Sequence, residues 1–230
     1  MPTGVITDAL AVAAGALLGA AAGRALSTDF KDKMNMIFGC CSMGMGIASI
    51  VLMQNMPAVI FALIIGTALG LVLRLGERIQ SAASALLGKT DDRTALLVTA
   101  IVLFCASGTG IYGSIVSGMT GDHSILISKA ILDLFTAMIF ACTIGAVTAA
   151  IAIPQFLVFM LLYMGAGLIL PMTDASMTAD FKACGGFIML ATGFRMLKLT
   201  MFPIADMIPA LVLVMPLSHL WSAWILPLVS

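Results

Sequence analysis

The hydrophobic positions of this chain form long, nearly continuous apolar runs that are separated by short polar or proline-containing interruptions. An apolar run of about 20 residues is the length that crosses a bilayer as a helix. Pro57, Pro154, Pro203 and the polar stretch 89–93 mark the breaks between runs. The pattern predicts an all-α polytopic membrane protein with about eight transmembrane helices, at residues 4–24, 34–53, 57–75, 94–118, 124–150, 154–172, 183–201 and 207–227.

Composition supports the membrane assignment. Of the 230 residues, 61% are hydrophobic and 10% are charged, whereas soluble domains carry about 25% charged residues. Eight spans leave little chain for anything else, so residues 1–230 are expected to form a single integral membrane domain. No basic cluster suggests a nucleic-acid partner, and no CxxC or paired-histidine spacing suggests a metal or other cofactor. The N-terminus lacks the basic region of a signal peptide and is expected to be a retained first span.

The distribution of lysine and arginine predicts an orientation. If the eight helices alternate strictly, only Lys129 and Lys182 lie towards one side of the membrane. The basic residues expected on or near the other side are Arg24, Lys31, Lys33, Arg74, Arg78, Lys89, Arg93, Arg195 and Lys198. Basic residues favour cytoplasmic loops. Both termini are therefore predicted to lie outside the cytoplasm of a multi-pass protein.

Glycines at a four-residue spacing predict close helix contacts. Gly15, Gly19 and Gly23 share one face of the first helix, and Gly66 and Gly70 share one face of the third. Such faces let helix backbones approach closely in lipid. Packing within one protomer is the first interpretation, and a homodimer interface is the alternative.

A weak internal repeat is suggested by three matches in the same order. The segments 29–31 and 180–182 both read Asp-Phe-Lys, and Pro57 and Pro209 each precede a last helix. Between these matches lie glycines seven apart, Gly39 and Gly46 in one copy and Gly186 and Gly193 in the other. Helices one to three (about 4–75) would then match helices six to eight (about 154–227) in opposite orientation, on either side of a central hairpin (about 94–150). Inverted repeats of this kind are common in secondary transporters, which bind substrate near the membrane midplane.

The central segment concentrates polar chemistry in an otherwise apolar chain. Five glycines between positions 108 and 121 predict a broken helix, because glycine weakens helix interiors. Asp122 has a plain structural role available as an N-cap, Lys129 and Asp133 can pair four residues apart, and His123 is a candidate to carry a coupling proton. The candidate substrate- or ion-binding residues are Thr109, Gly110, Ser114, Ser117, Gly118, Thr120, Gly121, Asp122, His123, Ser124, Lys129 and Asp133.

The run GDHSxLxxKxxLD, carried by residues 121–133 after the glycine-rich helix, resembles the uncharacterised bacterial membrane protein family that includes YqgA and YdfK. The resemblance extends over nearly the whole chain. It implies a protein of the bacterial cytoplasmic (inner) membrane, and it supplies no catalytic residues.

Taken together, these features predict a small secondary transporter or ion-conducting protein and not an enzyme. A small anion or organic acid is the preferred substrate, because a helix N-terminus, Lys129 and the hydroxyls favour negative groups, with a proton as a candidate coupling ion. Asp122 and Asp133 favour a cation or proton instead. The alternatives are a non-transporting scaffold or regulatory subunit and, with less support, an intramembrane enzyme, for which no catalytic motif is present.

Overall fold

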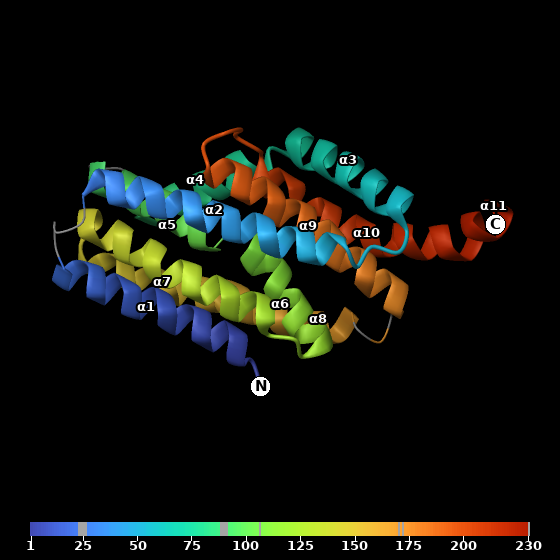
Figure 1. Cartoon of the computed structure of the whole chain (residues 1–230), viewed down its shortest axis with the longest axis horizontal. Helices are drawn as coiled ribbons and strands as arrows, with labels where there is room; N and C mark the ends of the chain where they lie inside the picture. Colours follow the sequence, from blue (N-terminus) through green and yellow to red (C-terminus); the bar gives the residue numbers. More distant parts are fainter. Residues whose placement is uncertain (23–26, 88–91, 106, 170, 172, 230) are drawn as a thin grey trace. The chain divides into compact units, whose positions relative to one another are not determined.

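The computed structural model describes residues 1–22, 27–87, 92–105, 107–169, 171 and 173–229, and every regular element in these ranges is helical (Figure 1). The elements are α1 (Thr3–Ala22), α2 (Thr28–Ile50), α3 (Met56–Leu73), α4 (Leu75–Leu87), α5 (Asp92–Cys105), α6 (Gly108–Thr120), α7 (Ser124–Ile144), η2 (Ala146–Ile151), α8 (Ala152–Ile169), α9 (Ala175–Met196), η4 (Ile204–Met207), α10 (Pro209–Leu220), η5 (Trp221–Ile225) and α11 (Leu226–Val229). The predicted all-α class is confirmed. Gly23, Arg24 and Lys89, which entered the predictions on packing and charge, lie outside the described residues.

The helices form two compact units, each assembled from distant parts of the chain. The first unit comprises Met1–Phe38 and Glu77–Leu168, and the second comprises Gly39–Gly76 and Ile169–Ser230. The first therefore holds α1, α5, α6, α7 and α8, and the second holds α3, α9 and α10. Each unit combines one segment from the first 76 residues with one later segment of the chain.

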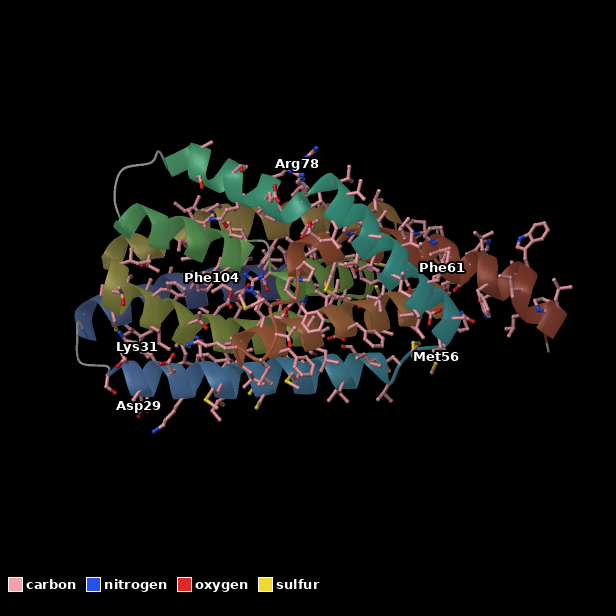
Figure 2. The ribbon with its side chains drawn as sticks, turned by 90° about the horizontal axis from the view of Figure 1, so that it is seen from above. Asp29, Lys31, Met56, Phe61, Arg78 and Phe104 are labelled. Atoms are coloured by element: carbon pink, nitrogen blue, oxygen red, sulfur yellow. The ribbon has the colours of Figure 1, made fainter. Side chains whose placement is uncertain are left out.

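Six helical stretches in the described ranges are long and apolar enough to cross a membrane. They are Thr3–Ala21, Met56–Leu73, Ala100–Thr120, Ser124–Ile144, Ala146–Gly167 and Ile204–Leu228. The expected spans at 34–53 and 183–201 fall in α2 and α9, which are not among the six. Both helices are long enough, but charged, glycine and hydroxyl residues lower their hydropathy. Helix α3, in contrast, is strongly apolar, and large apolar side chains such as Phe61 (53% exposed) lie on its surface (Figure 2).

In the first unit, glycines bring α1 and α7 into backbone contact. The two helices lie side by side (Figure 1), and a Cβ added at Gly15 would lie 2.0 Å from the carbonyl oxygen of Leu134. A Cβ at Gly19 would lie 2.1 Å from that of Met138. Because both residue numbers increase together, the helices run parallel. The first interpretation of these glycines, packing within one protomer, is confirmed.

Glycines have the same role in the second unit. Gly66 and Gly70 of α3 pack against Ala210 and Asp206, which lie in and before α10. The segment of α2 in this unit crosses α9 through two reciprocal glycine contacts, Gly39 with Gly193 and Gly46 with Gly186. The two α2–α9 contacts run antiparallel along the chain.

A buried carboxylate also stabilises the second unit. Asp180 of α9 is fully buried, and its oxygens accept hydrogen bonds from the backbone N–H groups of Gln54 (2.7 Å) and Asn55 (2.9 Å). The Asn55 side-chain amide (2.9 Å) and the Ser218 hydroxyl (2.7 Å) donate to it as well. Four donors satisfy the carboxylate, which fixes the loop before α3 to α9 and α10.

The position of Asp180 changes one part of the predicted repeat. Asp29 is the second residue of α2 and its side chain is 74% exposed at the start of that helix (Figure 2). Asp180 is the sixth residue of α9 and is fully buried. The two Asp-Phe-Lys segments therefore hold different places in their helices. The notion that each segment opens its helix holds for Asp29 and is wrong for Asp180.

Ser218→Ala is expected to lower the free energy of unfolding by about 1–2 kcal/mol, because one donor to a buried carboxylate is lost. The amides of Gln54 and Asn55 should then exchange faster with solvent deuterium. The matched control is Ser84→Ala, since the Ser84 hydroxyl donates only to Gln80 O within its own exposed helical turn. Equal effects of the two substitutions would contradict this role of Ser218.

Candidate functional site

Four polar side chains meet inside the first unit and form a buried cluster, called here the polar cluster: Asp8 of α1, Lys129 and Asp133 of α7, and Gln155 of α8. The Lys129 ammonium forms ion pairs with Asp8 Oδ2 (3.3 Å) and with Asp133 Oδ2. The Gln155 amide nitrogen donates to the same two oxygens, at 2.8 Å and 3.0 Å. All four residues are at most 9% exposed, and each lies within a candidate membrane span.

The sequence of α1 and α7 places these groups at one level. Parallel packing through Gly15 and Gly19 sets the register, so that Asp8 lies opposite Lys129. One turn further along α7, Asp133 reaches the same ammonium, as the four-residue spacing predicts. Helix α8 runs the other way and brings Gln155 alongside Asp8.

Aromatic rings enclose the ammonium group of Lys129. Its Nζ lies 5.2 Å from the ring centroid of Phe159 and 6.0 Å from that of Phe104. Both rings are fully buried, and Phe104 lies among the interior side chains in Figure 2. The faces of aromatic rings attract cations. Apolar walls of this kind strengthen charge interactions within the cluster and raise the cost of any unpaired charge.

The polar cluster lies beside the interruption that was expected in helix 94–118. That stretch forms two helices, α5 ending at Cys105 and α6 beginning at Gly108, and the Ser107 side chain caps α6 by accepting the Gly110 N–H. Phe104 belongs to the last turn of α5, and Phe159 packs against Gly110 in the first turn of α6. The interruption precedes the glycines instead of falling among them, and Gly110, Gly113 and Gly118 pack closely against residues outside α6. Gly118, for example, contacts the backbone of Tyr163.

The charges of the polar cluster do not balance. Two carboxylates face one ammonium, so the formal charge is −1 when all three groups are ionised. Two buried oxygens, Asp8 Oδ1 and Gln155 Oε1, have no hydrogen-bond partner in the described structure. Buried acceptors are ordinarily satisfied. A positive group or a hydrogen-bond donor would complete this cluster.

The hydrogen bonds described within the polar cluster involve none of the predicted hydroxyls. The Ser114 hydroxyl donates to Gly110 O (2.7 Å) and that of Thr120 to Val116 O (2.9 Å), both within α6. Ser117 is hydrogen-bonded to the imidazole of His123, and Thr109 is buried near the start of α6. These side chains therefore stabilise α6 and its exit.

The predicted residues at the α6–α7 corner form a separate, more exposed group. Gly121 adopts a left-handed conformation (φ 72°) that ends α6. The Asp122 carboxylate accepts the N–H of Ser124 (3.0 Å), two residues further on. The predicted N-cap role of Asp122 is wrong, because His123 occupies the N-cap position and makes no side-chain cap hydrogen bond. Asp122 and Ser124 are exposed, in contrast to the buried Lys129 and Asp133.

Two members of the cluster, Asp8 and Gln155, were not predicted. A signal for Asp8 was present, because it is the one charged residue before Arg24 in an otherwise apolar segment, and an ionisable group at membrane depth is costly. Gln155 follows Pro154 and has no comparable signal. No group of three or more His, Cys, Asp or Glu side chains that could hold a metal ion occurs among the residues placed by the structure.

The fold and this cluster together define an all-helical protein with the character of a multi-span membrane protein. Residues 3–219 match the family described as "Protein of unknown function (DUF554)", and the chain belongs to this family. It is 44% identical to the "Uncharacterized protein YqgA" of Escherichia coli (strain K12), over 97% of this chain and 99% of that protein. It is 24% identical to the "Uncharacterized membrane protein YdfK" of Bacillus subtilis (strain 168), over 91% of this chain and 93% of that protein. No solved structure matches the chain.

Proposed function

We propose that the protein is a small secondary transporter or ion-conducting protein of the bacterial cytoplasmic membrane, and that the polar cluster binds its coupling ion. The observation that carries this proposal is that the cluster has two carboxylates and only one ammonium group. Its residues are buried and lie in three candidate membrane spans. Ionisable groups at this depth are costly and mark ion pathways or proton relays. A buried charge without a partner costs free energy unless the group takes up a proton and becomes neutral.

The repeat supports a transporter when it is aligned by a shift of 147 residues. Ser27 caps α2 through the N–H of Phe30, and Asp174 (174 − 27 = 147) caps α9 through the N–H of Met177. The glycine contacts follow the same shift, since Gly39 corresponds to Gly186 and Gly46 to Gly193. Such a shift relates α1 to α8 and α2 to α9.

Two hydrogen bonds join residues that this shift makes equivalent. The first is Gln155 Nε2 to Asp8 Oδ2, and the second is Ser42 Oγ to Met189 O, each across 147 residues of sequence. Antiparallel helices related by a two-fold axis meet their own equivalents at the axis. The polar cluster would then lie where an inverted-repeat transporter binds its ions.

The polar cluster favours a cation or proton over the anion preferred from sequence. That preference depended on Lys129, whose ammonium is already held by Asp8 and Asp133. An anion entering the cluster would meet a net negative charge. We therefore assign the cluster to a coupling cation or proton, and a small organic acid remains the cargo to be tested beside it.

Solid-supported-membrane recording from proteoliposomes tests the proposal. A pH step, or a concentration step of sodium, potassium, chloride or small carboxylates, should produce a current in the native protein. Asp8→Asn should reduce it by about tenfold or more, the change produced by ~1.4 kcal/mol of lost ion affinity. Asp122→Asn is the matched control and should keep its current, because Asp122 is exposed at the corner after α6.

Absence of current from the native protein across this panel would count against transport. Co-purification of a stoichiometric partner would then favour the scaffold or regulatory role. A homodimer remains our proposal for the assembly, to be tested by the mass of the detergent-solubilised particle. Because Gly15, Gly19, Gly66 and Gly70 all pack within the chain, these glycines are not available as its interface.

A further inference from the structure

We propose that Asp8 and Gln155 form a proton-binding site, with the proton carried on Asp8 Oδ1. The inference deepens the proposed function by naming the ion bound at the polar cluster, and it rests on that function for its role in transport. Its evidence is the pair of fully buried oxygens, Asp8 Oδ1 and Gln155 Oε1, that have no partner in the described structure.

The two side chains are already joined by half of an acid–amide pair. Gln155 Nε2 donates to Asp8 Oδ2 over 2.8 Å. A protonated carboxyl group is a donor at one oxygen and an acceptor at the other, and a primary amide offers the complementary acceptor and donor. With its proton on Oδ1, Asp8 can complete the pair by donating to Gln155 Oε1. Both unpartnered oxygens are then satisfied by one O–H group.

Proton binding also neutralises the polar cluster. The O–H bond forms at Asp8 Oδ1 with a proton supplied by hydronium of the aqueous phase, which becomes water, and the formal charge of the cluster changes from −1 to 0. Lys129 and Asp133 stay paired through Asp133 Oδ2. Loss of the proton restores a carboxylate that is held by Lys129 and the Gln155 amide. Each state therefore has a hydrogen-bonded arrangement, as a reversible proton carrier requires.

A metal cation fits this site less well. Hard cations such as Ca²⁺ and Mg²⁺ take six or more oxygen ligands, whereas two unpartnered buried oxygens are present here. The Lys129 ammonium, 3.3 Å from Asp8 Oδ2, would repel any metal ion bound to the same carboxylate.

Among the side chains that the structure describes, few other titratable groups face Asp8. Lys129 and Asp133 come from α7, and α8 contributes the neutral Gln155. The thiol of Cys105, at the end of α5, interacts electrostatically with Lys129 and Asp133. His123 lies near Gly4, about one turn before Asp8 along α1, and is hydrogen-bonded to Ser117.

Infrared difference spectroscopy of the full-length protein in lipid, labelled with ¹³C-aspartate, tests the site without a transport assay. A pH titration of the native protein should show the carbonyl band of a protonated aspartic acid that appears as the pH falls and shifts in D₂O. The band should be absent from Asp8→Asn and present in Asp133→Asn and in the exposed control Asp122→Asn. Gln155→Leu should keep the band at a higher frequency, because the acid loses its amide partner.

Other results would overturn the inference. A band that persists in Asp8→Asn, or that disappears in Asp133→Asn instead, places the proton elsewhere. A change produced by sodium or potassium at constant pH and lost in Asp8→Asn identifies a metal cation. The labelled native protein and Gln155→Leu keep the test valid if Asp8→Asn does not fold. Proton binding without any current would leave this site intact and contradict the transport function alone.

Discussion

Replacing Lys129 with methionine is expected to lower the free energy of unfolding by about 3–5 kcal/mol, the effect of removing one partner from a buried ion pair. Methionine preserves much of the side-chain volume, so the cost comes mainly from two carboxylates left without a cation. Lowering the pH should reduce the cost, because a protonated carboxyl group no longer carries an unpaired charge. Equilibrium unfolding of the purified protein in mixed micelles measures the difference.

The chain contains a matched control for this substitution. Lys33 forms an ion pair with Asp29 at the same four-residue spacing, but the two side chains are 71% and 74% exposed. Exposed pairs contribute about 0–1 kcal/mol, so Lys33→Met should have little effect. The double variant Lys129→Met/Asp133→Leu should recover part of the loss, because it removes one unpaired carboxylate. Similar effects at Lys129 and Lys33 would contradict a buried cluster.

Gly15→Ala is expected to lower the free energy of unfolding by about 3 kcal/mol, the upper end of the usual range for overpacking. The added Cβ would lie 2.0 Å from Leu134 O and 2.8 Å from Leu134 C. These are backbone atoms, which cannot rotate away, so α1 and α7 must separate. A displaced α1 would also move Asp8 away from Lys129, and the current of the variant should fall with its stability.

Gly44→Ala is the control for the glycine substitution. Gly44 lies within α2, and a Cβ there would meet no atom within 4 Å. Alanine favours a helix over glycine by about 0.5–1 kcal/mol, so this variant should be as stable as the native protein or slightly more stable. A Gly15→Ala protein that unfolds like the native one would show that α1 and α7 are not in backbone contact.

The location of the glycine contacts was predictable, but their partners were not. The spacing of Gly15 with Gly19 and of Gly66 with Gly70 indicates faces on which helices approach closely. Nothing in that spacing names α7 or α10 as the neighbour. The repeat shows the same limit. The Asp-Phe-Lys match pairs Asp180 with Asp29, but Asp180 is the sixth residue of α9 and Asp29 is the second residue of α2.

The part of the candidate site that could be predicted consists of contacts within one helix. Lys129 and Asp133 lie four residues apart on one helix, and their pairing is a local consequence of helix geometry. The hydrogen bonds of Ser114 and Thr120 are also local, since each hydroxyl donates to the carbonyl oxygen four residues earlier in α6. We expected these hydroxyls to belong to a substrate- or ion-binding site, but they donate to acceptors within their own helix.

The sequence alone determined that the chain is helical and membrane-like, because apolar run length and residue spacing are properties of contiguous segments. It also predicted an interruption of the helix at 94–118, although it placed this among the glycines and not before them, and it placed Lys129 beside Asp133. Only the tertiary structure decided that Asp8 and Gln155 join them, across 121 and 22 residues of sequence from Lys129 and Asp133 respectively. Contacts over such distances depend on which helices pack together and in which register, and that choice is made by backbone approach at glycines such as Gly15.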